Sequence, residues 1–102
     1  MKKIINGKKY DTETATKVAE YWNGCSTSDF NYLYKELYRK RTGEFFLYGS
    51  GGASTGYSKK CGNNSWCGDE RITPLSVEDA KKFAERNCTA DEYEKIFGEV
   101  EE

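Results

Sequence analysis

Apolar and polar residues alternate most clearly between residues 31 and 49, on both sides of a basic turn. The stretch LYRKRTGEFFLYGSGG, residues 37–52, is the densest part of this region. An alternation of period two is typical of β-strands. Arg41-Thr42-Gly43 fits a three-residue hairpin loop with glycine in the left-handed position. We therefore predict an antiparallel hairpin with strands near 31–40 and 44–49.

The loop also predicts the pairing within this central hairpin. The predicted pairs are Lys40 with Glu44, Tyr38 with Phe46, and Leu37 with Leu47. One face then carries Leu33, Lys35, Leu37, Arg39, Phe45 and Leu47, and the other carries Tyr32, Tyr34, Glu36, Tyr38, Phe46 and Tyr48. Both faces are largely apolar. If helices cover the leucine face, the tyrosines are left for another layer or for a partner.

The N-terminal residues predict a second hairpin followed by a helix. Asn6-Gly7 is a strong two-residue turn signal between Ile4-Ile5 and Tyr10. Asp11 is a good N-cap. A helix is expected from about Thr12 to Asn23, because one stripe of helical spacing runs along this segment. Its members are Ala15, Val18, Ala19 and Trp22.

The C-terminal third predicts a short strand and two more helices. The strand lies near 71–73 and is expected to end at Pro74. Ser76 caps the next helix, with Asp79 in the fourth place of a capping pattern. Thr89 and Glu92 form a capping box for the last helix. That helix points Tyr93, Ile96 and Phe97 inward and ends at Gly98.

These elements predict an α+β fold. A small antiparallel sheet contains the N-terminal hairpin, the central hairpin and the short strand near 71–73, and three short helices pack on it. A chain of 102 residues favours one domain, expected to span 1–98, with a solvated acidic tail at 99–102. The glycine-rich segment 49–68 lacks periodicity, so we expect a long loop that is functional or mobile.

Charge is unevenly distributed, although the formal net charge is only -1. Basic residues gather in the middle of the chain at Lys35, Arg39, Lys40, Arg41, Lys59 and Lys60, whereas the C-terminal third is acidic. This balance excludes a general DNA binder, which carries a strong net positive charge. No secretory or membrane-spanning pattern is visible. We expect a cytoplasmic protein with no membrane partner.

Candidate catalytic chemistry is sparse. The chain has no histidine, so the commonest general base is missing. The four cysteines lack the paired spacing of a zinc site, and a local Cys61–Cys67 disulfide is possible on oxidation. A phosphate-loop motif is absent, because Tyr57 stands where lysine is needed. We predict a protein that is not an enzyme and holds no metal or cofactor.

A binding surface is better represented in the sequence. Tyrosine and arginine are enriched at interface hot spots, and exposed aromatic residues on a sheet stack on bases. The candidate binding residues are Tyr34, Tyr38, Arg39, Lys40, Arg41, Lys59, Lys60 and Trp66. Lys40 and Arg41 are expected to project into solvent at the hairpin tip, with Lys59 and Lys60 on the loop that leaves the same hairpin. The competing interpretation is that the aromatic residues are core.

Four strings of the sequence resemble a known family. They are NGKKYDTETA, LYRKRTGEFFLYG, GNNSW and DEYEKIFG, and together they cover most of the chain. They resemble small proteins carried by mobile elements of Gram-positive bacteria, similar to type II-A anti-CRISPR proteins. The resemblance implies an inhibitor of the RNA-guided effector nuclease, working in the cytoplasm of the bacterial host by binding the nuclease, its guide RNA or both. It assigns no binding residues.

Two other functions are compatible with the same residues. One is a small RNA-binding module that uses the basic and aromatic hairpin face. The other is a small enzyme that processes nucleic acid. An inhibitor could also place its acidic helical region in the basic nucleic-acid channel of such a nuclease. The sequence does not choose between these surfaces, and it does not predict the oligomeric state.

Overall fold

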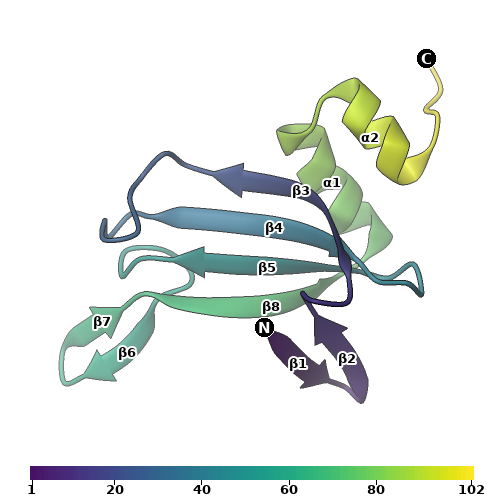
Figure 1. Cartoon of the computed structure of the whole chain (residues 1–102). Coiled ribbons are helices and arrows are strands. Elements are labelled where there is room, and N and C mark those ends of the chain that lie inside the picture. The colour runs from purple at the N-terminus through teal and green to yellow at the C-terminus, as the bar shows by residue number, and fades with distance from the viewer.

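The computed structural model of the protein describes all residues, 1–102, and contains eight strands and two helices (Figure 1). The strands are β1 (Lys2–Ile5), β2 (Lys8–Asp11), β3 (Thr16–Trp22), β4 (Leu33–Arg39), β5 (Phe45–Gly51), β6 (Lys59–Gly62), β7 (Ser65–Cys67) and β8 (Asp69–Leu75). The helices are α1 (Val77–Asn87) and α2 (Ala90–Phe97). The predicted α+β class is confirmed.

The centre of the fold is a four-stranded antiparallel sheet with the order β3-β4-β5-β8. Its middle strands are the predicted central hairpin, and the predicted register is confirmed, since Tyr38 pairs with Phe46 and Leu37 with Leu47. The loop closes as expected: the amide of Lys40 donates to the carbonyl of Glu44 at 2.8 Å. Gly43 has a φ of 92°, which glycine adopts without a side-chain clash.

The predicted helix from Thr12 to Asn23 is wrong, because most of this segment forms the edge strand β3. A shift of register between Lys17 and Ala19 marks a β-bulge, and Val18 and Ala19 both pack toward the cluster beneath the helices. Two adjacent apolar residues on one side imitate helical spacing. The apparent stripe is in fact divided, because Ala15 packs against a different cluster and Trp22 is exposed.

The two faces of the sheet have separate apolar clusters. Leu37, Phe45 and Ala80 form one beneath the helices, with Phe83, Ile96 and Phe97 packed against it. On the opposite face, Tyr10 from the N-terminal hairpin packs with Tyr38, Phe46 and Ile72. The β1–β2 hairpin predicted from Asn6-Gly7 is confirmed, but it forms a separate two-stranded sheet rather than part of the central sheet as predicted. This hairpin covers one end of the face that carries Tyr34, Tyr38, Phe46 and Tyr48, which we call the tyrosine face. The core is therefore split into two thin layers.

Both C-terminal helices begin where the capping residues predict, and α2 also ends at the predicted Gly98. Ser76 Oγ accepts from the amide of Asp79 at 3.1 Å at the start of α1. Thr89 and Glu92 form a complete capping box at the start of α2. Gly98 ends α2 with a φ of 91°. The protein thus has two helices rather than the three that the sequence predicted.

The strand near 71–73 is longer than predicted, because β8 continues through Pro74 to Leu75. This is allowed because β8 is an edge strand, where a missing backbone donor breaks no bond to an outer neighbour.

The segment 49–68 is more regular than predicted. β5 runs on to Gly51, and β6 and β7 form a third hairpin closed by a Cys61–Cys67 disulfide. Tyr57, in the connection from β5 to β6, is buried.

The molecule is elongated, with extents of 51 × 33 × 20 Å and a radius of gyration of 15.0 Å, against about 13 Å for a typical domain of this length. The N-terminal hairpin, the helices and the 40–44 turn lie toward one end of the sheet, whereas β6 and β7 extend from the other (Figure 1). Neither helix has the length and apolar character needed to cross a membrane.

Candidate functional site

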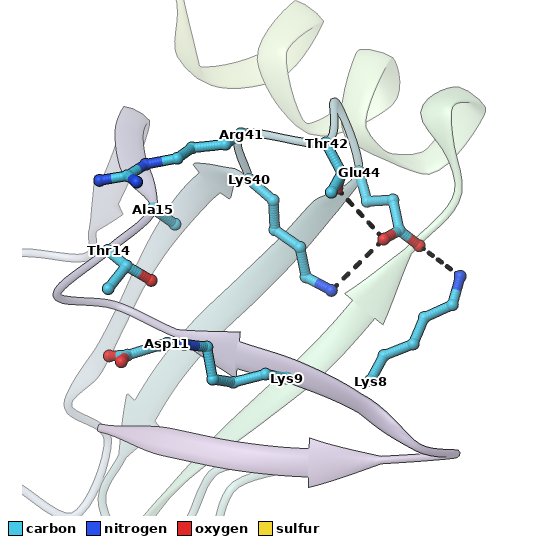
Figure 2. A pocket seen from close by; sticks show the side chains of 9 residues that line it. All are labelled: Lys8, Lys9, Asp11, Thr14, Ala15, Lys40, Arg41, Thr42 and Glu44. Atoms are coloured by element: carbon cyan, nitrogen blue, oxygen red, sulfur yellow. Dashed lines mark hydrogen bonds and ion pairs between the residues drawn. The ribbon is translucent and has the colours of Figure 1, made fainter.

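A basic hollow lies where the 40–44 turn meets the N-terminal hairpin (Figure 2). It has a volume of about 410 Å³. Its lining residues are Lys8, Lys9, Asp11, Thr14, Ala15, Lys40, Arg41, Thr42 and Glu44. Both hairpins form because each has a glycine in its turn, and the packing of Tyr10 beside Tyr38 and Phe46 brings their ends together. The basic hollow is therefore built by two segments that are distant in the sequence.

Glu44 organises one side of the basic hollow. Its carboxylate oxygens lie 2.8 Å from Lys8 Nζ and 3.4 Å from Lys40 Nζ, and Thr42 Oγ1 donates to it at 3.2 Å. The hydrogen bond from Lys8 lowers the pKa of Glu44, and the same bond raises the pKa of Lys8. Glu44 is thus ionised at neutral pH and partly neutralises these two lysines.

The other side of the basic hollow retains free positive charge. Arg41 extends away from Glu44 toward Thr14 and Ala15 (Figure 2), and neither Arg41 nor Lys9 takes part in an ion pair. With four cations and two carboxylates, the lining has a net charge of +2, while the whole chain has -1. This field attracts anions, and guanidinium and ammonium groups are the usual ligands of phosphate oxygens.

Lys40 is not the free tip residue that the sequence predicted. Its side chain is only 12% exposed and pairs with Glu44. Its Nζ atom lies 3.6 Å from the centre of the Tyr10 ring, which is a cation–π contact between the two hairpins. Lys40 therefore holds the walls of the basic hollow together, whereas exposed Arg41 keeps the predicted position at the tip.

The sheet places three other candidate residues on opposite faces. Arg39 points to the helix side, where its Nη1 donates to the carbonyl of Ile96 at 2.9 Å near the end of α2. Tyr38 is buried and stacks on Phe46 with ring centres 5.2 Å apart, so it belongs to the core. Tyr34 is partly exposed on the same face as Tyr38, and its hydroxyl contacts Glu20 and Glu36.

Lys59, Lys60 and Trp66 lie far from the basic hollow. They are on the β6–β7 hairpin, at the opposite end of the sheet from the 40–44 turn (Figure 1). Lys59 Nζ is 3.5 Å from an oxygen of Asp69, and Lys60 is paired across the hairpin with Trp66, which is 58% exposed. The structure therefore divides the predicted basic patch between two ends of the molecule.

Lys8 and Lys9 were missed as candidate site residues. They lie on β2, directly after the Asn6-Gly7 turn, and enter the basic hollow only because that hairpin folds onto the sheet. The one local signal was the basic character of the hairpin, with Lys2, Lys3, Lys8 and Lys9 within a few residues. Such a signal does not show which sheet face the hairpin covers.

Comparisons with protein-family models, curated proteins and solved structures find no match for this chain. The resemblance to anti-CRISPR proteins therefore rests on the four sequence strings alone.

Proposed function

We propose that this chain is a non-enzymatic binding protein that inhibits a host defence nuclease, the RNA-guided effector of a type II-A CRISPR system. The observation that carries the binding part of this proposal is the basic hollow. It gathers four cations in a chain of net charge -1. Stability alone gives little reason to concentrate like charges there. The identity of the partner comes from the resemblance in sequence.

The chemistry of the basic hollow favours an anionic partner surface. A guide-loaded effector presents RNA phosphates and acidic side chains, and both are recognised by arginine and lysine. Arg41 and Lys9 are the residues available for this contact, because neither has a carboxylate partner within the chain. Lys40 and Lys8 keep their bonds to Glu44 and shape the site.

The test is cleavage of target DNA by a guide-loaded type II-A effector in the presence of this chain. We expect the wild-type chain to inhibit, and the Lys9→Glu, Arg41→Glu variant to require a concentration about tenfold or more higher. Lys81→Glu, Lys82→Glu on exposed positions of α1 is the matched control, because it changes the net charge by the same amount. Circular dichroism verifies that each variant is folded.

Two results would contradict the proposal at different points. A wild-type chain that leaves cleavage unchanged rejects the inhibitory function. If the wild type inhibits and the Lys9→Glu, Arg41→Glu variant inhibits equally strongly, the inhibitory function stands. The basic hollow then has no part in it.

RNA binding without an effector is the second candidate, and the same basic hollow favours it. Contacts to phosphates release counterions, so affinity for single-stranded RNA would fall steeply with salt. Titration of the free chain with single-stranded RNA at two salt concentrations separates the candidates. Tight, salt-sensitive binding without the effector favours the RNA-binding module, and its absence favours an inhibitor that needs the assembled nuclease.

A further inference from the structure

Two rows of side chains cross all four strands on the tyrosine face. One row contains Trp22, Tyr34, Ser50 and Glu70, and the next contains Glu20, Glu36, Tyr48 and Ile72. Residues directly opposite each other in antiparallel strands point to the same side of the sheet. The rows are adjacent because their members are two residues apart on each strand. We call the surface of Trp22, Tyr34, Tyr48, Glu20, Glu36 and Glu70 the open face.

The N-terminal hairpin does not cover the open face. Tyr10 packs on Tyr38 and Phe46 toward the other end of the sheet, and on Ile72 at the border of the open face, where Tyr48 is only partly buried. Trp22 is 59% exposed, and its indole nitrogen donates to the carbonyl of Cys25 at 2.8 Å. That bond fixes the ring against the end of the sheet and leaves much of it in solvent.

Carboxylates lie beside both tyrosine rings of the open face. The Tyr34 hydroxyl is 2.7 Å from an oxygen of Glu36 and 3.0 Å from an oxygen of Glu20. A hydroxyl has one hydrogen, so it can donate to only one of these carboxylates at a time. The Tyr48 hydroxyl is 2.7 Å from Glu70. Burial is the main cause that raises the pKa of Tyr48 to about 12, and the hydrogen bond to Glu70 contributes to the same shift. The phenol therefore remains a hydrogen-bond donor at neutral pH.

Positive charge on the chain does not balance these carboxylates. Lys17 Nζ lies 3.1 Å from Glu20 and 3.5 Å from Glu36, whereas Glu70 takes part in no ion pair. Glu36 and Glu70 also line a hollow of about 350 Å³ with Tyr48, Met1 and Thr12. The amino group of Met1 is held by Thr12 Oγ1 at 2.9 Å. The open face therefore combines aromatic rings with an excess of negative charge.

This combination suits arginine better than any other natural side chain. A guanidinium group is planar, stacks on tryptophan or tyrosine, and forms paired hydrogen bonds with a carboxylate. We propose that the open face is a docking surface for an arginine-rich segment of a partner polypeptide. Nucleic acid is disfavoured there, because the three carboxylates repel phosphates.

This inference goes beyond the proposed function and does not depend on it. The basic hollow attracts anions at one end of the tyrosine face, and the open face attracts cations toward the other. The two surfaces have opposite charge and different residues, so variants of one leave the other intact.

The test uses two peptides of equal length and charge, one repeating arginine, glycine and serine, the other with lysine in place of arginine. We expect the full chain to bind the arginine peptide about fivefold or more tighter, because an ammonium group neither stacks nor forms paired bonds equally well. Trp22→Ala and the double variant Glu20→Gln, Glu70→Gln should each weaken binding about tenfold. Glu99→Gln, Glu101→Gln on the exposed C-terminal residues is the matched control.

Calorimetry with each peptide gives the affinities, and circular dichroism verifies the fold. Trp22→Phe is a second variant that keeps an aromatic ring and should retain most of the affinity even if Trp22→Ala unfolds. Equal affinity for both peptides, equal losses in the control variant, or no binding at all would each overturn the proposal. Binding of single-stranded RNA by the free chain that is lost in Trp22→Ala would overturn it as well.

Discussion

Gly49 and Tyr57 illustrate how one residue decides the packing of another in this thin fold. Gly49 lies on the helix-side face of β5, beyond the area that the helices cover, and the buried Tyr57 ring rests against it. Arg71 of β8 lies over the same ring at 4.9 Å. A Cβ atom at position 49 would overlap the Tyr57 ring, so only glycine leaves room for it.

We expect Gly49→Ala to destabilise the protein by about 1–3 kcal/mol, because the Tyr57 ring must move out of its position. The matched control is Gly56→Ala, since a Cβ atom there meets nothing within 4 Å. That variant should change the free energy of unfolding by less than about half a kcal/mol. Urea unfolding of both variants gives the measurement, and equal stability of the two would contradict this packing.

The same scale explains why Lys40 and Arg41 differ in role although they are neighbours. Lys40 lies between the Tyr10 ring and Glu44, so its reversal to glutamate would set two carboxylates side by side. Arg41 is exposed and can be reversed without that conflict. A variant that reverses both Lys40 and Arg41 would lose packing as well as binding. Lys9 is therefore the better residue to reverse together with Arg41.

At the scale of elements, the β6–β7 hairpin is the least supported part of the fold. Every residue of β6 is exposed, and in β7 only Cys67 is partly buried. Its two strands are joined by the Cys61–Cys67 disulfide, which closes a short loop. The hairpin therefore depends on this bond and on its own backbone hydrogen bonds rather than on packing against the sheet.

We expect Cys61→Ser, Cys67→Ser to loosen this hairpin and leave the sheet unchanged. Amide hydrogen exchange should become faster at residues 59–67 and stay constant in β4 and β5. Closing so short a loop stabilises by about 2 kcal/mol at most, so the melting temperature should fall by no more than about 10 °C. Cys25→Ser, at a free cysteine, is the control. Faster exchange throughout the sheet would show that the hairpin supports the whole fold.

At the scale of the whole molecule, a single sheet has a separate thin layer on each face. Only 11 of 102 residues are buried, and none of them is polar or charged. Tyrosine hydroxyls at the borders of these layers donate to carboxylates, as Tyr38 does to Glu36 at 2.9 Å. Burial is the main cause that raises the pKa of Tyr38 to about 12, and the hydrogen bond to Glu36 contributes to the same shift. Protonated tyrosines are thus part of what holds the tyrosine face together.

This arrangement predicts a loss of stability at alkaline pH. The pKa values of Tyr38 and Tyr48 in the folded protein are about 12, above the ordinary value of 10.0. Their contribution is fully present below pH 10 and is lost as the pH rises toward 12, because the unfolded chain ionises first. A shift of two pKa units corresponds to about 2–3 kcal/mol at most for buried Tyr38.

Urea midpoints measured from neutral to alkaline pH test this prediction. Tyr48→Phe should flatten the decline, because a phenol with a raised pKa is removed. Tyr93→Phe is the control, since the Tyr93 hydroxyl is bound to no group of the chain and its ring packs on Phe97 with centres 4.9 Å apart. A midpoint that does not fall as the pH approaches 12 would contradict the role given to the phenols.

Local signals in the sequence were enough to predict several elements of this protein. The glycine at position 43 and the alternation around it predicted the central hairpin and its register, because a three-residue loop allows few pairings. The capping residues Ser76 and Thr89 predicted the starts of both helices, because caps act within one turn. Asn6-Gly7 predicted the N-terminal hairpin, because a two-residue turn is also a local signal.

Only the tertiary structure decided which side each element covers and what each charge meets. The bulge beside Val18 gave β3 a helical spacing, and pairing with β4 overrode it. Folding of the N-terminal hairpin onto Tyr38 and Phe46 made those rings core and left Tyr34 and Trp22 open. The same contact brought Lys8 and Lys9 to Arg41, and the length of the sheet kept Lys59 and Lys60 away. A sequence pattern acts over a few residues, whereas these surfaces depend on contacts between segments far apart in the chain.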